Sequence, residues 1–403
     1  MGEILRRQFL QNVAQTSPSP MLVEVERAEG VFFYTPEGKP YYDLVAGVSV
    51  SNVGHANPDV VEAVKTQAER YMHIMVYGEM IERPQVEYAV EIAEALPAPL
   101  EAVYFLNSGA EAVEGALKLA KRYTHRTEII SMRRAYHGST HGAMSVMGEP
   151  EGEEWKNAFR PLLPDCRALD FNSFNDLQYI SERTACVLCE PVQGEAGVRP
   201  PKEGYLEALR KRCDEVGALL IFDEIQTGMG RSGEMFACVK YGVTPDIICL
   251  AKAFGGGMPL GAFVASKEVM DSLQSDPVLG HITTFGGHPV CCAAGLAAFR
   301  YLKKHNVVAE VERKGALYEE LLQEHPAVVE IRRSGLLLAV ELGSEERLFR
   351  LMEIFKEEGI LSDWFLYCST AFRISPPLVI SEEEVRDSAA IILRALDKLV
   401  DKN

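Results

Sequence analysis

The chain has 403 residues, 47% of them apolar, which is enough for a large buried core and about two or three domains. Its 58 acidic and 41 basic residues give a formal charge of -17, which argues against nonspecific binding to nucleic acid. The longest apolar runs fall far short of the roughly 20 residues that span a bilayer, so we expect no membrane partner. We expect a cytoplasmic protein, because no targeting signal is visible and the nine cysteines lack disulfide-like spacing.

The first predicted element is an antiparallel hairpin at residues 31–43, where two short strands flank a Pro/Gly turn. Helical spacing of apolar residues follows at 60–71 and 84–96. Beyond these helices, short apolar strands alternate with amphipathic helices. This order predicts an α/β fold with a mostly parallel sheet that helices cover on both faces.

Long helices return after about residue 290, before strands at 328–333 and 336–342 and a C-terminal helix from Glu382. This composition predicts a smaller α+β domain, which the N-terminal hairpin completes. We therefore expect residues 59–290 to form the large domain. Residues 1–58 and 291–403 would contribute to the small one.

Four apolar strands within the large domain run directly into polar or glycine-rich residues. They are predicted at residues 102–106, 185–188, 218–222 and 247–250. In open parallel sheets, functional residues gather where the strands end at their carboxyl edges. We therefore expect the four strand ends to face one pocket.

A possible anion site follows the first of these strands, at Ser108, Gly109 and Ala110. Ser108 and Glu111 predict a capping box at the start of a helix. Glycine lets a ligand approach the backbone, and the free N–H groups with the helix dipole attract a phosphate. An ordinary capped helix would show the same pattern.

Asp223 and Lys252 end two further apolar strands. An unpaired buried charge costs several kcal/mol, so Asp223 needs a cation such as a protonated ring nitrogen, or its pKa must rise. Lysines are mostly solvated, so Lys252 is unusual at an apolar strand end. Desolvation would lower its pKa, and a neutral amine can form an imine with an aldehyde.

Three other motifs allow different interpretations. The segment 228–233 reads GxGxxG, but no long helix and no suitably placed acidic residue follow it, so a nicotinamide site is not expected. Cys186 and Cys189 form a CxxC pair inside an apolar run, which predicts a buried strand rather than a redox or zinc site. His137 and His141 are four apart without HExxH, so we expect no metal there.

The combined motifs closely resemble the class III aminotransferases, the family of ornithine, acetylornithine and 4-aminobutyrate types. The matching segments cover nearly the whole chain: 42–43, 54–55, 107–112, 136–138, 190–195, 221–233, 245–247, 252, 255–261 and 284–287. The resemblance implies aminotransferase fold type I and a pyridoxal 5'-phosphate cofactor. It also implies a homodimer with shared active sites.

The resemblance further assigns roles around the cofactor. Lys252 would form the aldimine and then move the proton between substrate and cofactor, while Asp223 would keep the pyridine nitrogen protonated. The remaining contacts would be Gln226 to the ring oxygen, Ser108, Gly109 and Ala110 to the phosphate, Tyr136 stacked on the ring with His137 beside it, and Thr284 reaching the phosphate from the neighbouring subunit.

The resemblance also assigns the substrate side of the site. Arg373 would grip a substrate carboxylate, and Glu195 would pair with Arg373 when the donor has no carboxylate at that end. This pair implies an acetylornithine-like or ornithine-like donor with a terminal amino group, and 2-oxoglutarate as acceptor. A structural salt bridge is the alternative interpretation of the same two residues.

The chain departs from the family at Ser139, where acetylornithine and 4-aminobutyrate enzymes have an arginine that helps bind a carboxylate. Ser139 cannot supply that charge, so the substrate stays open. Arg133 or Arg134 could compensate, although both precede Tyr136. His288 also stands where many members have Asn.

Two other functions are compatible with the same scaffold. One is an isomerase, racemase or decarboxylase, such as a semialdehyde mutase. The other is a binding protein without catalysis. Arg373 together with Glu195 favours amino transfer, and intact Lys252 and Asp223 argue against a loss of catalysis.

Overall fold

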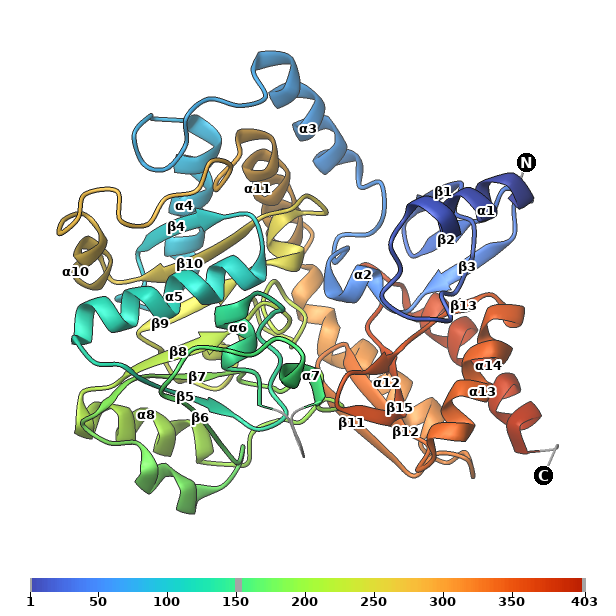
Figure 1. Ribbon diagram of the computed structural model, residues 1–403. Coiled ribbons are helices and arrows are strands. Elements are labelled where there is room, and N and C mark those ends of the chain that lie inside the picture. Colours follow the sequence, from blue (N-terminus) through green and yellow to red (C-terminus); the bar gives the residue numbers. More distant parts are fainter. Residues whose placement is uncertain (1, 149–153, 401–403) are drawn as a thin grey trace.

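A seven-stranded sheet forms the centre of the computed structural model, which describes residues 2–148 and 154–400 (Figure 1). Its strand order is β4-β10-β9-β8-β7-β5-β6. The bounds are β4 Ala102–Leu106, β5 Glu128–Met132, β6 Cys166–Leu169, β7 Thr184–Cys189, β8 Leu219–Asp223, β9 Ile247–Leu250 and β10 Gly261–Ala265. The mostly parallel sheet is confirmed.

β10 is the antiparallel member of this sheet. It pairs with β4 on one side, with Gly261 opposite Leu106, and with β9 on the other, with Ala262 opposite Leu250. Gly261 packs so closely that a Cβ atom there would lie 2.3 Å from the carbonyl oxygen of Ser108. Glycine is therefore required where β10 passes the end of β4.

Helices cover both faces of the sheet because successive side chains of a strand point to opposite sides. Ile221 and Cys249 belong to the core cluster that contains the buried residues of α5, while Leu220, Phe222 and Ile248 belong to the core cluster on the other face, which includes residues of α8 and α11. α5 Gly109–Thr124 covers one face of the sheet. The helices on the other face are α4 Arg83–Ala95, α8 Tyr205–Val216 and α11 Pro289–Lys304, and α3 Pro58–Arg70 packs on α11. The central strands β7, β8, β9 and β10 are buried on both faces, as expected for a parallel sheet, whereas the edge strands β4 and β6 are only partly buried.

The N-terminal hairpin consists of β2 Phe32–Tyr34 and β3 Pro40–Asp43, which pair antiparallel as predicted. β1 Arg27–Glu29 extends one edge, and β13 Ile360–Leu361 pairs parallel to β3 at the other. A strand from the C-terminal region thus completes a sheet that the N-terminal region begins.

The third sheet is antiparallel, in the order β11-β12-β15-β14. Its strands are β11 Glu330–Ser334, β12 Leu337–Glu341, β14 Trp364–Phe365 and β15 Cys368–Ile374, and its helices are α12 Val311–Leu322, α13 Glu345–Glu358 and α14 Glu382–Val400. These elements give the smaller α+β part at the lower right of Figure 1.

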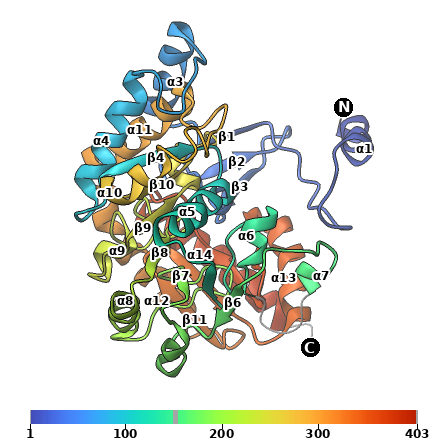
Figure 2. The ribbon, with the colours of Figure 1, turned by 60° about the vertical axis from the view of Figure 1, so that its left-hand side comes forward.

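Short helices connect the larger elements. They are α1 Gly2–Asn12, α2 Ala46–Ser49, α6 His141–Ser145, α7 Glu154–Asn157, α9 Ala237–Lys240 and α10 Lys267–Met270, with 3-10 turns η1 Phe174–Tyr179, η2 Lys252–Gly255, η3 Asp271–Leu273 and η4 Val307–Glu310. α1 projects away from the body of the molecule (Figure 2). Within residues 2–148 and 154–400, no helix combines the length and hydrophobicity that a bilayer crossing requires.

The GxGxxG segment at 228–233 has a structural role, because its Arg231 connects the large sheet to the terminal regions. The four-residue α9 follows it, so the long helix of a dinucleotide site is absent from this described region. The buried Arg231 guanidinium donates to the carbonyl oxygens of Leu336 (2.8 Å) and Pro376 (2.7 Å) and to Oδ1 of Asn52 (2.6 Å). One side chain therefore ties the large sheet to both terminal regions.

Candidate active site

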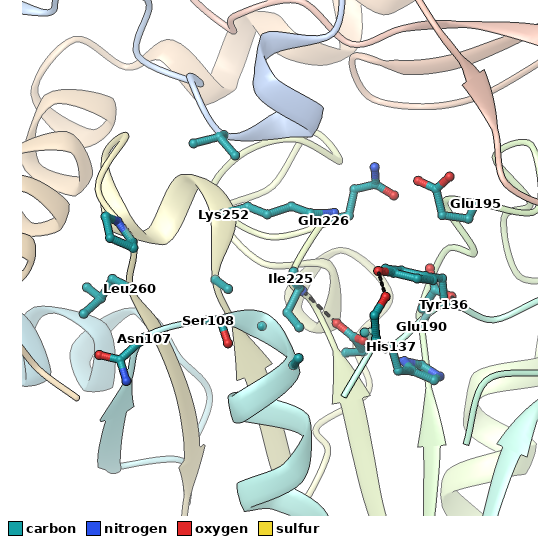
Figure 3. Close-up of a pocket in the computed structure, with 18 of the residues that line it drawn as sticks. Asn107, Ser108, Tyr136, His137, Glu190, Glu195, Ile225, Gln226, Lys252 and Leu260 are labelled. Atoms are coloured by element: carbon teal, nitrogen blue, oxygen red, sulfur yellow. Dashed lines mark hydrogen bonds and ion pairs between the residues drawn. The ribbon is translucent and has the colours of Figure 1, made fainter. Parts of the chain in front are cut away.

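The four strand ends meet at one cavity of about 530 Å³, as expected (Figure 3). Asn107 follows β4, Glu190 follows β7, Asp223 ends β8 and Lys252 follows β9. Ten residues predicted for the site line this cavity: Ser108, Gly109, Ala110, Tyr136, His137, Ser139, Glu195, Asp223, Gln226 and Lys252. The carboxyl edge of the sheet thus gathers residues from far apart in the sequence.

Lys252 stands at the start of η2, with a φ of 53° that is uncommon for a residue with a side chain. Its side chain extends into the cavity toward Gln226 and Glu195 (Figure 3). Burial lowers the pKa of the Lys252 ammonium, although Glu195 opposes this effect. A lowered pKa favours the neutral amine that imine formation requires.

Asp223 and His137 form a buried pair beside Lys252. Nδ1 of His137 lies 2.7 Å from Oδ2 of Asp223, and Oδ1 of Asp223 accepts a 3.0 Å bond from the Ile225 N–H. Only 4% of Asp223 and 2% of His137 is exposed, and Nε2 of His137 has no hydrogen-bond partner within residues 2–148 and 154–400. A carboxylate held this firmly in an apolar wall suits a cationic ring nitrogen.

The start of α5 forms a narrow cradle. The predicted capping box is wrong in one half: Oγ of Ser108 accepts from the Glu111 N–H (3.2 Å), but Oε2 of Glu111 accepts from the N–H of Asn107 (2.7 Å). The Glu111 side chain thus bonds to the N–H of Asn107 and not to that of Ser108, which a capping box would require. Ser108, Gly109 and Ala110 at this helix start line the cavity, where free N–H groups of the first turn would favour an anion.

Two glycines keep this cradle open. A Cβ atom on Gly109 would lie 2.9 Å from Cδ1 of Ile225, and one on Gly138 would lie 2.7 Å from Cβ of Ala110. Gly138 also has a φ of 126°, which residues with side chains rarely adopt. Side chains at positions 109 and 138 would therefore collide with Ile225 and Ala110, which line the same cavity, so glycine is favoured at both positions.

Glu190 is a site residue that the sequence interpretation missed. Its Oε1 accepts from the Tyr136 N–H (3.1 Å) and its Oε2 from the Gly194 N–H (2.9 Å). Burial raises the pKa of Glu190 to about 7, against the opposing effect of His137. The available signal was its position at the end of the second apolar strand.

Ser139 lies beside Tyr136, with 3.0 Å between their hydroxyl oxygens. The expected compensation by Arg133 or Arg134 is not found, because neither lines the cavity. Both are exposed, and Arg133 pairs with Asp170 at 3.1 Å. The wall at Ser139 is therefore polar but uncharged.

Arg373 lies behind Glu195 and is 1% exposed. Its Nη2 donates to Oε1 and Oε2 of Glu195 at 2.9 and 3.0 Å, and its Nε donates to Oδ1 of Asp363 at 2.8 Å. Nη1 is buried and has no hydrogen-bond partner in the part of the chain that the structure describes. Arg373 lowers the pKa of Glu195, although burial alone would raise it.

Thr284 is exposed and does not line the cavity of its own chain. Its neighbours Ile282 and Phe285 are 52% and 54% exposed. A contact of Thr284 with the phosphate would therefore have to come from a second chain, and this role stays a prediction.

Cys186 and Cys189 lie in β7 and are completely buried, which confirms the buried-strand interpretation. Burial raises the pKa of both thiols. His141 begins α6 on the surface, whereas His137 is buried in the preceding loop. The two histidines therefore do not share a helix face.

The residues present fit a ligand that combines an aldehyde, a phosphate and a basic ring nitrogen. Lys252 supplies the amine, the start of α5 an anion cradle and Asp223 a buried carboxylate. Nε2 of Gln226 and Nε2 of His137 are buried in the cavity wall, and no described residue forms a hydrogen bond with either. Pyridoxal phosphate has this set of groups.

Comparison with known proteins agrees with the geometry. Residues 13–396 match the family model described as aminotransferase class-III. Acetylornithine aminotransferases from Methanopyrus kandleri and Clostridium acetobutylicum are 41% and 37% identical, over 97% and 92% of this chain and 98% and 95% of theirs. The solved ornithine aminotransferase from Toxoplasma gondii matches with a TM-score of 0.91 at 32% identity, covering 100% of this chain and 96% of that one. The chain therefore belongs to the class III aminotransferases, which use pyridoxal phosphate to transfer amino groups.

Proposed function

We propose that this aminotransferase moves a terminal amino group from an ω-amino or acetylornithine-like donor to 2-oxoglutarate. The observation that carries the proposal is the ion pair between Glu195, which lines the cavity, and the buried Arg373 behind it. In the paired state, the guanidinium is neutralised and a donor without a carboxylate at that end fits. When Glu195 moves away, Nη1 and Nη2 of Arg373 become a fork for a carboxylate.

The cofactor supplies an aldehyde that condenses with amines and a ring that withdraws electrons from the reacting carbon. We assign Lys252 to hold the cofactor and to carry the proton at the substrate carbon. Asp223, oriented by His137, would keep the ring nitrogen protonated. The remaining assignments are Ser108, Gly109 and Ala110 to the phosphate, Gln226 to the ring oxygen and Tyr136 to the ring face.

We further propose that the enzyme is a cytoplasmic homodimer in which Thr284 reaches the partner's phosphate. Exposed apolar side chains support an interface near this residue, among them Met72, Ile81, Val278, Ile282 and Phe285. The nine free cysteines fit a reducing compartment. We also propose the large domain at 59–290, with 1–58 and 291–403 forming the small one, which the pairing of β3 with β13 supports.

The test is a donor screen on the cofactor-loaded enzyme. Single amines and amino acids are added, and the visible absorbance of the cofactor is followed together with the keto acid or aldehyde released. A donor with a terminal amine should bleach the absorbance and yield its carbonyl product stoichiometrically. If no amine bleaches the absorbance, amino transfer is refuted. If the substrate is isomerised and no free carbonyl compound appears, the enzyme is a mutase or racemase.

A variant checks the anchor. Lys252→Ala should lack the absorbance of the lysine-bound cofactor and should not convert any donor. An unchanged spectrum would place the cofactor elsewhere.

A further inference from the structure

Three consecutive residues contact the guanidinium of Arg373 in addition to Glu195. Oδ1 of Asp363 accepts from Nε at 2.8 Å, the Trp364 carbonyl oxygen lies 3.5 Å from Nη2, and the Phe365 ring centroid lies 4.5 Å from Cζ. Phe365 is completely buried. We call residues Asp363–Phe365 the guanidinium cradle.

The cradle and Arg373 belong to one sheet. β14, which holds Trp364 and Phe365, pairs antiparallel with β15, which holds Arg373. The backbone N–H of Arg373 also donates to the carbonyl oxygen of Asp363 at 2.9 Å. Asp363 and Arg373 therefore keep their relative position as long as this sheet stays intact.

Glu195 is attached differently. It lies in the segment after β7 of the large sheet. Its carboxylate contacts Arg373 and the Leu366 N–H, which lies 3.1 Å from Oε2, and its backbone carbonyl oxygen accepts from the Tyr367 N–H at 2.9 Å. These contacts can break without disturbing any strand pairing. Of the two carboxylates on Arg373, Glu195 is thus the movable one and Asp363 the fixed one.

The guanidinium nitrogens divide in the same way. Nε is occupied by Asp363 and Nη2 by Glu195, and Nη1 is buried with no hydrogen-bond partner among the described residues. Departure of Glu195 would leave both Nη1 and Nη2 without a carboxylate partner, while Nε stays bound. A substrate carboxylate could then replace the Glu195 carboxylate, with no change in the buried net charge.

Resting on the transamination proposed above, we infer that the guanidinium cradle is a positioning device that holds Arg373 in place for a substrate carboxylate while Glu195 is away. Asp363 fixes the rotation of the guanidinium through Nε, and Phe365 fixes its plane. Without the cradle, the freed arginine could turn toward solvent or follow Glu195. The cradle would thus matter for carboxylate substrates and not for amines that lack a carboxylate.

The experiment compares Asp363→Asn and Phe365→Leu with the parent enzyme. Glu341→Gln is the matched control, because Glu341 pairs with Arg332 at 3.1 Å in the same sheet, and neither lines the cavity. One measurement is the Kd of 2-oxoglutarate for the cofactor-free protein by calorimetry. The other is the single-turnover rate of each half-reaction of the loaded enzyme, with a simple terminal amine and with 2-oxoglutarate.

For Asp363→Asn we expect the Kd of 2-oxoglutarate to rise at least about tenfold, as for loss of a charge-assisted bond. The amine half-reaction should keep its rate, and Phe365→Leu should show the same pattern more weakly. Equal Kd values in the parent and both variants would overturn the cradle, as would an equal loss in both half-reactions. Absence of any amine turnover in the parent would instead refute the transamination itself.

Discussion

Replacing Glu224 with Gln should remove a pH-dependent cost to folding. The Glu224 carboxylate is 1% exposed and accepts bonds from the N–H groups of Ala237 (2.5 Å) and Cys238 (2.6 Å). Burial raises its pKa from 4.5 to about 7, because these bonds only partly compensate for lost hydration. Glu224 does not line the cavity, so the effect can be measured apart from catalysis.

The raised pKa of Glu224 determines the direction in which stability changes with pH. Between pH 4.5 and about 7 the folded chain binds more protons at Glu224 than the unfolded chain does, so stability falls as the pH rises through this window. The gap of about 2.5 between the two pKa values corresponds to roughly 3 kcal/mol. The cost is absent below pH 4.5 and complete above about pH 7.

The assay is urea unfolding of the cofactor-free parent and Glu224→Gln proteins at pH 4.5 and pH 8, with exposed Glu320→Gln as the charge control. Other carboxylates, including Glu190, are present in both proteins and cancel in the difference. The free energy of unfolding of the parent should fall relative to the Gln variant by roughly 3 kcal/mol from the lower to the higher pH. A difference that does not change with pH would refute the reasoning.

Three further predictions concern the cavity. Ser139→Arg should place a cation on the uncharged wall and lower the KM for dicarboxylate substrates by about tenfold, relative to monocarboxylates, in steady-state assays; equal KM values would contradict this. Gly138→Ala should weaken pyridoxal phosphate binding, measured by titration of the cofactor-free protein, because its Cβ would meet Ala110 at a φ that costs about 1–3 kcal/mol. Glu195→Gln should tighten carboxylate binding to Arg373 and slow the terminal-amine half-reaction, and an unchanged ratio of the two half-reactions would exclude its role as a switch.

The centre of the large sheet was predictable because β7, β8, β9 and β10 are buried on both faces and read as continuous apolar runs. β4 matches the expected residues 102–106, and β7 and β8 differ by one residue at their ends. The pocket followed from the same pattern, because parallel strands end at one edge. The two-residue β13 was not predictable, since its stability depends on pairing with β3 more than 300 positions earlier.

Side-chain partners were harder to foresee than positions. Asp223 was identified as a buried carboxylate, but the 2.7 Å contact from His137 joins a loop to the end of β8, and their proximity depends on the sheet order. Asp363 carries no motif, and its importance depends on strand pairing with β15. Glu111 satisfied a local capping rule in sequence, yet it bonds to Asn107 because that amide lies closer.

The antiparallel course of β10 has a consequence for how this active site can evolve. β10 is zipped to β4, which leads into Ser108, and to β9, which leads into Lys252. The distance between the anion cradle and the amine of Lys252 thus depends on the register of β10 with β4 and on its register with β9. Gly261 is the position of closest backbone approach. A one-residue slip in either ladder would turn alternate side chains to the wrong face. β10 therefore fixes the distance between the anion site and Lys252, which has to match a cofactor of fixed length. The substrate wall around Ser139 and Arg373 belongs to loops and a separate sheet, so it can change in evolution without altering that distance.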